Sequence, residues 1–141
     1  MAGATTSVRD NRKASPFVAV IDDDESVSRS IKRLLRSIGI NAESFVSGEE
    51  FLRLLAAMPS YRPSCVILDV QMPGMNGLEV QRVVAHMAMP VIFITAHDDY
   101  AVRERALACG AIAFLRKPFN DDIFVRAVRA ALDPPAPADN S

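Results

Sequence analysis

The sequence has few of the residues and runs that build disulfides, zinc sites or membrane spans. Two cysteines stand apart in 141 residues, Cys65 inside an apolar run and Cys109 near the end of an expected helix. Isolated cysteines usually behave as small buried hydrophobic residues, so we expect both to be buried. No apolar run approaches the roughly 20 residues of a membrane span, and residues 1–15 contain no apolar signal segment. These absences predict a cytoplasmic protein with no membrane partner.

The sequence also lacks an excess of either charge. Its 16 basic and 17 acidic residues give a formal net charge of −1, which argues against a general binder of nucleic acid. A chain of 141 residues predicts one domain with one well-filled core. We expect residues 16–132 to form this domain, with a disordered extension at 1–15 and a flexible tail rich in proline and alanine at 133–141.

Five strand-like runs alternate with five segments of helical periodicity. The expected strands are residues 17–21, 41–45, 65–69, 91–95 and 111–115. The expected helices begin near residues 25, 47, 76, 98 and 120. This alternation predicts an α/β fold, in which a parallel sheet is covered by helices on both faces.

Side-chain patterns predict how the helices begin and which sides they bury. Ser47 followed by Glu50 is a capping-box pattern, and Asn120 suits the N-cap of the last helix. Apolar spacing predicts that Val83, Leu107 and Ile123 face inward. The first helix carries four basic residues between its apolar positions, which we interpret as a solvated face, with a nucleic-acid or partner patch as the alternative: Arg29, Lys32, Arg33 and Arg36.

Polar side chains stand at the carboxyl ends of four expected strands. They are Asp22, Asp23, Asp69, Thr95 and Lys117. Right-handed crossovers place these strand ends at the same edge of the sheet. Open α/β sheets bind their ligands at that edge. We therefore expect the five side chains to converge on one pocket.

Three carboxylates in one pocket require a compensating charge. Two unit charges about 4 Å apart repel by roughly 4 kcal/mol at an effective dielectric constant of 20. Oxygen ligands of this kind suit Mg²⁺, with Mn²⁺ as the alternative, and the group has no histidine or cysteine that would favour zinc. A purely structural alternative is that the acids only cap the helix that follows, but Asp24 alone is enough for that.

A carboxylate beside a cation can also act as a nucleophile and form an acyl phosphate. The attacking carboxylate must then be screened from the anionic phosphoryl group, whose oxygens need hydrogen-bond donors. Lys117 offers a positive charge and Thr95 a hydroxyl. These residue types together indicate phosphoryl transfer to Asp69.

Four motifs in this order make the sequence similar to the receiver domain of bacterial two-component response regulators, from about residue 17 to residue 132. They are Val-Ile-Asp-Asp-Asp at 20–24, Leu-Asp-Val-Gln-Met-Pro-Gly-Met-Asn-Gly at 68–77, Ile-Thr-Ala at 94–96 and Lys-Pro-Phe at 117–119. The sequence style resembles receivers of the FixJ/NarL type. The resemblance implies a flavodoxin-like (βα)₅ fold, a doubly wound parallel sheet with strand order 2-1-3-4-5.

The resemblance also implies roles for the acidic residues. Asp69 would accept a phosphoryl group from the histidine of a sensor kinase or a histidine phosphotransfer protein. Asp23, Asp69 and the backbone carbonyl of Gln71 would bind Mg²⁺ directly, and Asp22 would act mainly through water. Such a protein catalyses its own phosphorylation and is not a turnover enzyme on an external substrate.

The remaining implied roles concern the switch. Thr95 and Lys117 would contact the phosphoryl group, Phe114 would turn inward, and the Lys117–Pro118 peptide would be cis. His97, like Gln71, occupies a position that influences the lifetime of the phosphate. The fourth helix, fifth strand and fifth helix would form the surface that binds a downstream protein, and a phosphorylation-dependent homodimer is a further candidate.

Several interpretations of the whole chain stay open. We expect a stand-alone receiver that binds proteins and no nucleic acid, because little sequence follows the fifth helix. The alternative is the receiver part of a DNA-binding transcription regulator. A haloacid-dehalogenase-like phosphatase fits less well, because residue 71 is glutamine where that family has a second acid. An inactive receiver is disfavoured, because every required polar residue is present.

Overall fold

The fold alternates strands and helices along the chain. The computed structural model describes residues 16–97 and 99–133, so the predicted extension at 1–15 and residues 134–141 of the predicted tail lie outside the described residues. The strands are β1 (Phe17–Ile21), β2 (Asn41–Phe45), β3 (Cys65–Asp69), β4 (Val91–Thr95) and β5 (Ala113–Arg116). The helices are α2 (Glu25–Ser37), α3 (Gly48–Ala57), α4 (Gly77–Ala85), α5 (Tyr100–Ala108) and α6 (Asp121–Leu132).

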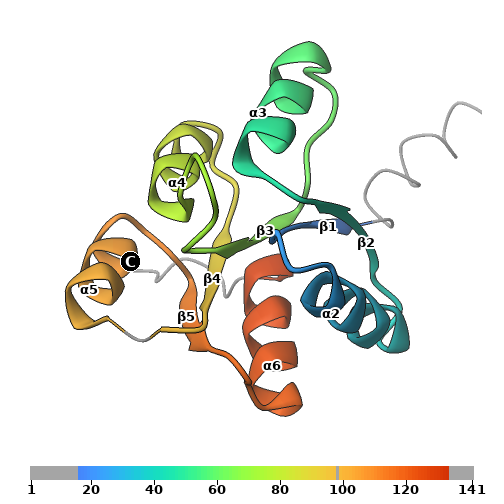
Figure 1. The fold of residues 1–141 in the computed structure, drawn as a ribbon. Helices are drawn as coiled ribbons and strands as arrows, with labels where there is room; N and C mark the ends of the chain where they lie inside the picture. The colour runs from blue at the N-terminus through green and yellow to red at the C-terminus, as the bar shows by residue number, and fades with distance from the viewer. Residues whose placement is uncertain (1–15, 98, 134–141) are drawn as a thin grey trace, which may run out of the picture.

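The five strands form one parallel sheet in the order β2-β1-β3-β4-β5. Helices α2 and α6 cover one face of the sheet, and α3, α4 and α5 lie on the other (Figure 1). Parallel neighbours joined by helices put every strand's carboxyl end at one edge. The predicted flavodoxin-like fold and its strand order are confirmed.

The neighbouring strands β3 and β4 are buried along their whole length. Every residue of β3 and β4 is buried. Val66 and Leu68 pack against the α3–α5 layer, whereas Cys65 and Ile67 pack against α2 and α6. Both faces of a parallel sheet are covered, so such strands are apolar throughout. Polar side chains therefore occur only at their carboxyl ends.

Helix starts follow the predicted caps, with one change. Ser47 accepts a hydrogen bond from the Glu50 backbone N–H at 3.1 Å, and Asn120 accepts one from the Ile123 N–H at 3.1 Å. The reciprocal half of the capping box differs, because the Glu50 carboxylate accepts from the Val46 N–H at 3.0 Å rather than from that of Ser47. The helix still begins where the sequence predicts.

Three side chains predicted to face inward are partly exposed, and so is one cysteine. Val83 is 39% exposed because it lies at the margin of the buried side of α4, which Val80, Gln81 and Val84 form. Leu107 is 40% exposed, because α5 lies beside the edge strand β5 and buries only Ala106. Ile123 is 50% exposed in the first turn of α6.

The remaining correction concerns the cysteines. Cys65 is fully buried in β3, as predicted. Cys109 is exposed, because it follows the last residue of α5 as its C-cap.

Gln81 is buried in place of an apolar residue since its amide donates to the Ala106 carbonyl at 3.0 Å. A hydrogen bond satisfies the amide, so a polar residue can occupy a core position.

Candidate functional site

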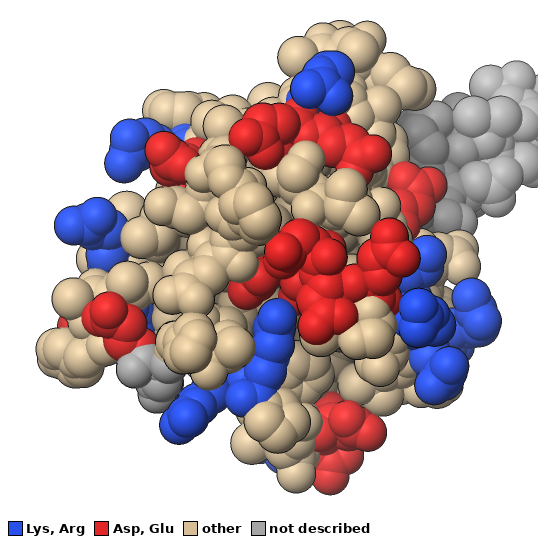
Figure 2. All heavy atoms as spheres, viewed as in Figure 1, with Lys and Arg blue, Asp and Glu red and all other residues tan. Residues whose placement is uncertain are grey.

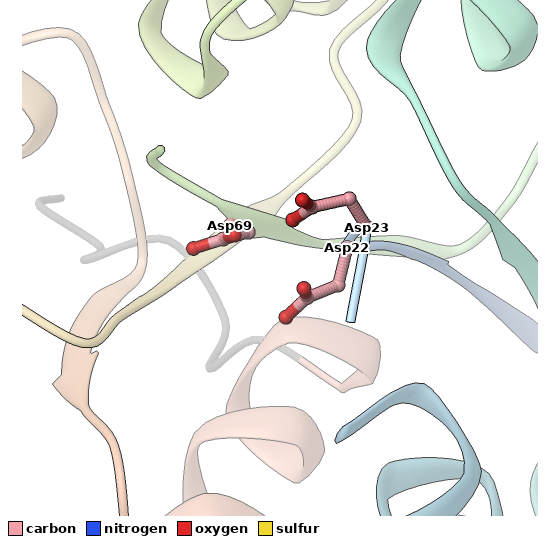
Figure 3. Close-up of side chains that lie close together, drawn as sticks. All are labelled: Asp22, Asp23 and Asp69. Carbon is pink, nitrogen blue, oxygen red and sulfur yellow. The ribbon is translucent and has the colours of Figure 1, made fainter. Parts of the chain in front are cut away.

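Three carboxylates converge at the carboxyl edge of the sheet. Asp69 is the last residue of β3, and Asp22 and Asp23 follow β1, the strand next to it. One carboxylate oxygen from each of the three lies within 4.8 Å of the others, and Figure 3 shows the three side chains close together around the end of β3. Asp22 and Asp69 are buried, whereas Asp23 is exposed. The predicted acidic cluster is therefore present and opens to solvent on the Asp23 side.

One cation lies beside this cluster. Lys117 follows β5, and its Nζ is 2.8 Å from Asp22 Oδ2 and 3.7 Å from Asp69 Oδ1. The Lys117–Pro118 peptide is cis, as the resemblance implied. Figure 2 shows acidic side chains gathered at the centre of this face with basic side chains below them. A single ammonium group cannot neutralise three carboxylates, so the cluster keeps a negative charge.

The electrostatics of Asp69 reflect this imbalance. Burial, reinforced by the negative charge of Asp22, raises the pKa of Asp69 to about 6, although the Lys117 charge acts in the opposite direction. Burial disfavours the ammonium of Lys117, but its hydrogen bond to Asp22 and the charges of Asp69 and Asp22 outweigh that effect and raise the pKa of Lys117. Asp69 is thus a carboxylate that a further cation would stabilise in its charged form.

The consecutive acids 22–24 divide into two roles. Asp24 caps α2, where its carboxylate accepts from the backbone N–H groups of Ser26 at 3.0 Å and Val27 at 3.3 Å. The hydrogen bond from the Ser26 hydroxyl lowers the pKa of Asp24. Asp22 accepts from the Asp24 N–H at 2.8 Å, which fixes its carboxylate beside Lys117. The capping role predicted for Asp24 is confirmed, and the cap-only alternative does not account for Asp22 or Asp23.

Thr95 ends β4 at the same edge and is buried. Its hydroxyl donates to the His97 carbonyl at 2.9 Å and accepts from the His97 N–H at 3.1 Å. Lys117, which follows the neighbouring strand β5, lies beside Thr95, and its backbone N–H donates to the Thr95 carbonyl at 2.7 Å. The structure therefore places Thr95 at the predicted edge, with its hydroxyl engaged by its own loop.

Gly77 allows the loop after Asp69 to close tightly. Its N–H donates to the Val70 carbonyl at 2.8 Å. A Cβ at this position would collide with the Asp69 carbonyl oxygen and lie 3.0 Å from both Val70 Cα and Phe93 Cε1. The start of α4 thus rests directly on the backbone that carries the phospho-acceptor candidate.

Glu49 is a residue near the site that sequence reasoning missed. Its carboxylate accepts from the Met75 N–H at 3.2 Å and lies beside Gly74, whose φ is +79°. This contact ties the start of α3 to the loop between β3 and α4. The two residues are 26 positions apart, and no spacing rule links an exposed glutamate to a loop at that separation.

Phe114 lies inward in this structure. It is buried in β5, and its ring centroid is 6.0 Å from that of Phe93 in β4. The guanidinium carbon of Arg103 lies 5.5 Å from the centre of the Phe114 ring, a separation at which cation and ring attract each other. This ring contacts β4 and α5, and it links the strand of Thr95 to the outer helix.

The donor set of the cluster fits a hard divalent cation. The three carboxylates supply only oxygen, Asp23 faces solvent, and Gln71 stands two residues beyond Asp69 at the same edge. Mg²⁺ binds one or two carboxylates and keeps several waters, so a site that is partly open to solvent suits it. The excess of negative charge gives an independent reason to expect a cation here.

Comparisons with known proteins agree with this geometry. The family profile of the response regulator receiver domain matches residues 18–129. Nodulation protein W of Bradyrhizobium diazoefficiens is 42% identical over 119 residues, which are 83% of this chain and 51% of that protein. The transcriptional regulatory protein FixJ of Azorhizobium caulinodans is also 42% identical over 119 residues, covering 82% of this chain and 54% of FixJ.

A solved structure resembles the fold closely. The response regulator receiver protein from Burkholderia phymatum is 66% identical, with a TM-score of 0.78, over 88% of this chain and 100% of that one. The chain spans about half the length of the curated relatives it matches.

Proposed function

Since the chain belongs to the family of response regulator receiver domains, we propose that it is a phosphorylation switch whose phospho-acceptor is Asp69. One observation carries the proposal. Asp69 ends a buried strand, with the carboxylates of Asp22 and Asp23 within 4.8 Å and Lys117 Nζ at 3.7 Å. This arrangement holds a nucleophile, a cation site and a fixed positive charge together, as phosphoryl transfer to a carboxylate requires.

In the proposed step, an Asp69 carboxylate oxygen forms a bond to the phosphorus of a phosphohistidine in a sensor kinase or a histidine phosphotransfer protein. The phosphorus–nitrogen bond breaks, and its electron pair stays on the donor imidazole. Mg²⁺ or Mn²⁺, held by Asp23, Asp69 and the Gln71 carbonyl with Asp22 acting mainly through water, would screen the carboxylates from the phosphoryl oxygens. Lys117 then pairs with an oxygen of the bound phosphoryl group. The protein catalyses its own phosphorylation and stores the group rather than turning over an external substrate.

The stored phosphoryl group would leave by hydrolysis, at a rate set by the access of water. Gln71 and His97 both have exposed side chains and follow Asp69 and Thr95 by two residues. We infer that these two residues flank the entrance and tune the lifetime of the phosphate.

The proposed output surface is the face formed by α5, β5 and α6. Thr95 would move toward the phosphoryl group, and Phe114 would adjust with it against α5. Helix α5 exposes apolar surface at Tyr100, which is 74% exposed, and at Leu107. Exposed apolar side chains on a helix suit a protein partner, either a downstream protein or a second copy of the chain.

Cytoplasmic location belongs to the same proposal, and none of the helices within the described residues is long and apolar enough to cross a membrane.

A second candidate is the receiver part of a DNA-binding transcription regulator. The similarity to FixJ, which is named a transcriptional regulatory protein, and the half-length match to it favour this interpretation. Both candidates share the same chemistry at Asp69, and they differ in what reads the switch.

The deciding experiment is phosphorylation by acetyl phosphate, followed by intact-mass spectrometry. We expect the wild-type protein to gain one phosphoryl group with Mg²⁺ and none with a chelator. Asp69→Asn should abolish the gain, because the amide is not a nucleophile. Asp24→Asn is the matched control, since asparagine can still cap α2 and the reaction should continue.

An unmodified wild-type protein with Mg²⁺ present would contradict the proposal. Equal modification of the wild type and Asp69→Asn would contradict the assignment of the acceptor.

A further inference from the structure

A hollow lined mainly by basic side chains lies between α2 and the end of β2, and it has a volume of about 350 Å³. Its wall includes Arg29, Lys32, Arg33 and Arg36 of α2, together with Phe45 and Val46. We call it the α2–β2 hollow. Figure 2 shows Lys and Arg side chains gathered at the right of the view, where Figure 1 places α2 and β2.

The cations of this hollow have no acidic partners among the described residues. Within residues 16–97 and 99–133, none of the four forms an ion pair. Glu25 is the one acid in the wall, so the hollow has a formal charge of about +3. The positions 29, 32, 33 and 36 recur on one side of the helix and extend over about 10 Å. Unpaired cations on one wall favour an anionic ligand.

A buried hydroxyl gives an independent indication of a ligand. Ser28 also lines the hollow and is only 5% exposed. Its Oγ is the one buried side-chain polar atom without a hydrogen-bond partner in the part of the chain that the structure describes. Buried polar groups are nearly always paired, and an unpaired one requires an explanation. Because Ser28 lines the hollow, a rotation of its side chain would bring the Oγ to a ligand oxygen there, which would supply the missing partner.

We propose that the α2–β2 hollow binds a small molecule that carries two phosphate groups, such as a nucleoside diphosphate. Three of the four cations are arginines, whose planar forks pair with two oxygens of a phosphate. A hollow with a formal charge of about +3 can compensate two phosphate groups, which carry more negative charge than one. Val46, which is 48% exposed, offers an apolar contact for the rest of the molecule. A concave volume of this size falls within the range of small-molecule pockets.

This site is independent of the proposed phosphorylation site. The acidic cluster around Asp69 repels anions unless a divalent cation is present, whereas the α2–β2 hollow attracts them. The groove that includes Lys117 and Pro118 is lined by other residues of α2, among them Val27 and Leu34. Only Arg33 lines both.

Titration calorimetry with ADP and with pyrophosphate, each in the presence of a chelator, tests the proposal. We expect one site that weakens as salt is added. Arg29→Gln and Arg36→Gln should each lower the affinity about five- to tenfold. Arg53→Gln on α3, which does not line the hollow, is the matched control and should leave the affinity unchanged.

Ser28→Ala separates a binding role from a structural one. Without ligand the variant should unfold at an equal or higher temperature, because it removes an unpaired buried hydroxyl. With ADP it should bind several-fold more weakly. NMR amide shifts on adding ADP should map to residues 28–36 and 44–46.

Two results would overturn the proposal. One is no binding of either phosphate compound at millimolar concentration; if an oligoglutamate peptide binds instead, the hollow is assigned to an acidic protein segment. The other is equal loss of affinity in Arg53→Gln and Arg29→Gln.

Discussion

Asp69 is buried beside two like charges and shares one ammonium group with Asp22. Lys117 Nζ lies nearer to Asp22, so Asp69 is the less compensated of the two buried carboxylates. In the proposed function this imbalance is useful. A carboxylate with a weak partner can bind a metal ion and then a phosphoryl group without first giving up a strong ion pair.

The stability of the metal-free protein should therefore depend on the proton of Asp69. The pKa of Asp69 is about 6 in the folded chain against an ordinary 3.8, so the folded state holds the proton more tightly. The stability contributed by protonated Asp69 is complete below about pH 4 and is lost as the pH rises through about 6. The side chain of Asp69→Asn stays neutral at every pH, so this variant should keep that stability above about pH 6. Its free energy of unfolding should exceed that of the wild type by about 1 to 3 kcal/mol above about pH 7.

Urea unfolding in a chelator at several pH values measures this difference. Glu104→Gln, which removes an exposed acid on α5, is the matched control for the loss of one negative charge. A constant difference between Asp69→Asn and the wild type across the range would show that the carboxyl is not perturbed.

Lys117 should matter to stability as well as to signalling. Lys117→Met leaves the buried Asp22 without its cation, which should lower the free energy of unfolding by about 3 kcal/mol. Adding Asp22→Asn removes the unpaired charge, so the double variant should be more stable than Lys117→Met alone. Chemical denaturation of the two single variants, the double variant and the wild type gives the coupling energy. Additive effects would mean that the 2.8 Å ion pair contributes nothing.

At the scale of the elements, α4 is held against β3 through Gly77. A methyl group there would meet backbone atoms of Asp69 and Val70, which cannot rotate away. Gly77→Ala should therefore lower the free energy of unfolding by about 2 to 3 kcal/mol. Because the displaced atoms carry Asp69, the variant should also be phosphorylated more slowly by acetyl phosphate.

Gly39→Ala provides the control for Gly77→Ala. Gly39 has a φ of +81°, but a Cβ at this position would have nothing within 4 Å of it, so only backbone strain of about 1 kcal/mol is expected. Equal losses in the two variants, or normal phosphorylation of Gly77→Ala, would show that close packing at the start of α4 is unimportant.

The sequence predicts elements well where one segment decides its own structure. The caps Asp24, Ser47 and Asn120 act within a few residues, and all three are confirmed. Burial within a helix depends on what lies opposite, and this is where predictions fail. Leu107 has an apolar side chain at a helical position, yet the sheet ends beside α5 and leaves it partly uncovered.

For the whole molecule, binding of Mg²⁺ should stabilise the fold. A ligand that binds only the folded state adds about 2.7 kcal/mol at a concentration about 100 times its Kd. The melting temperature of the wild type should therefore rise with Mg²⁺. Asp23→Asn should reduce this rise, because it removes one exposed carboxylate from the cluster. Asp24→Asn should rise as the wild type does, and an equal reduction in both variants would contradict the assigned ligands.

The convergence of the site is also predictable from the sequence, because it depends on a general rule. Right-handed crossovers bring the ends of β1, β3, β4 and β5 to one edge, and the cluster of Asp22, Asp23 and Asp69 follows. Contacts between surface groups far apart in sequence follow no such rule. The contact of Glu49 with Met75 and the pocket formed by α2 and β2 depend on the shape of the folded chain.

The two hydrogen bonds that hold the Thr95 hydroxyl to His97 have a consequence for the resting protein. In the proposed switch, Thr95 must release both before it can reach a phosphoryl group. At about 1 kcal/mol each, the released conformer would make up on the order of one molecule in thirty without phosphate. The background signal of the unphosphorylated population is then set by a local turn. The level of this background signal does not depend on how fast Asp69 gains or loses phosphate. The background signal and the response time of the switch can therefore change separately.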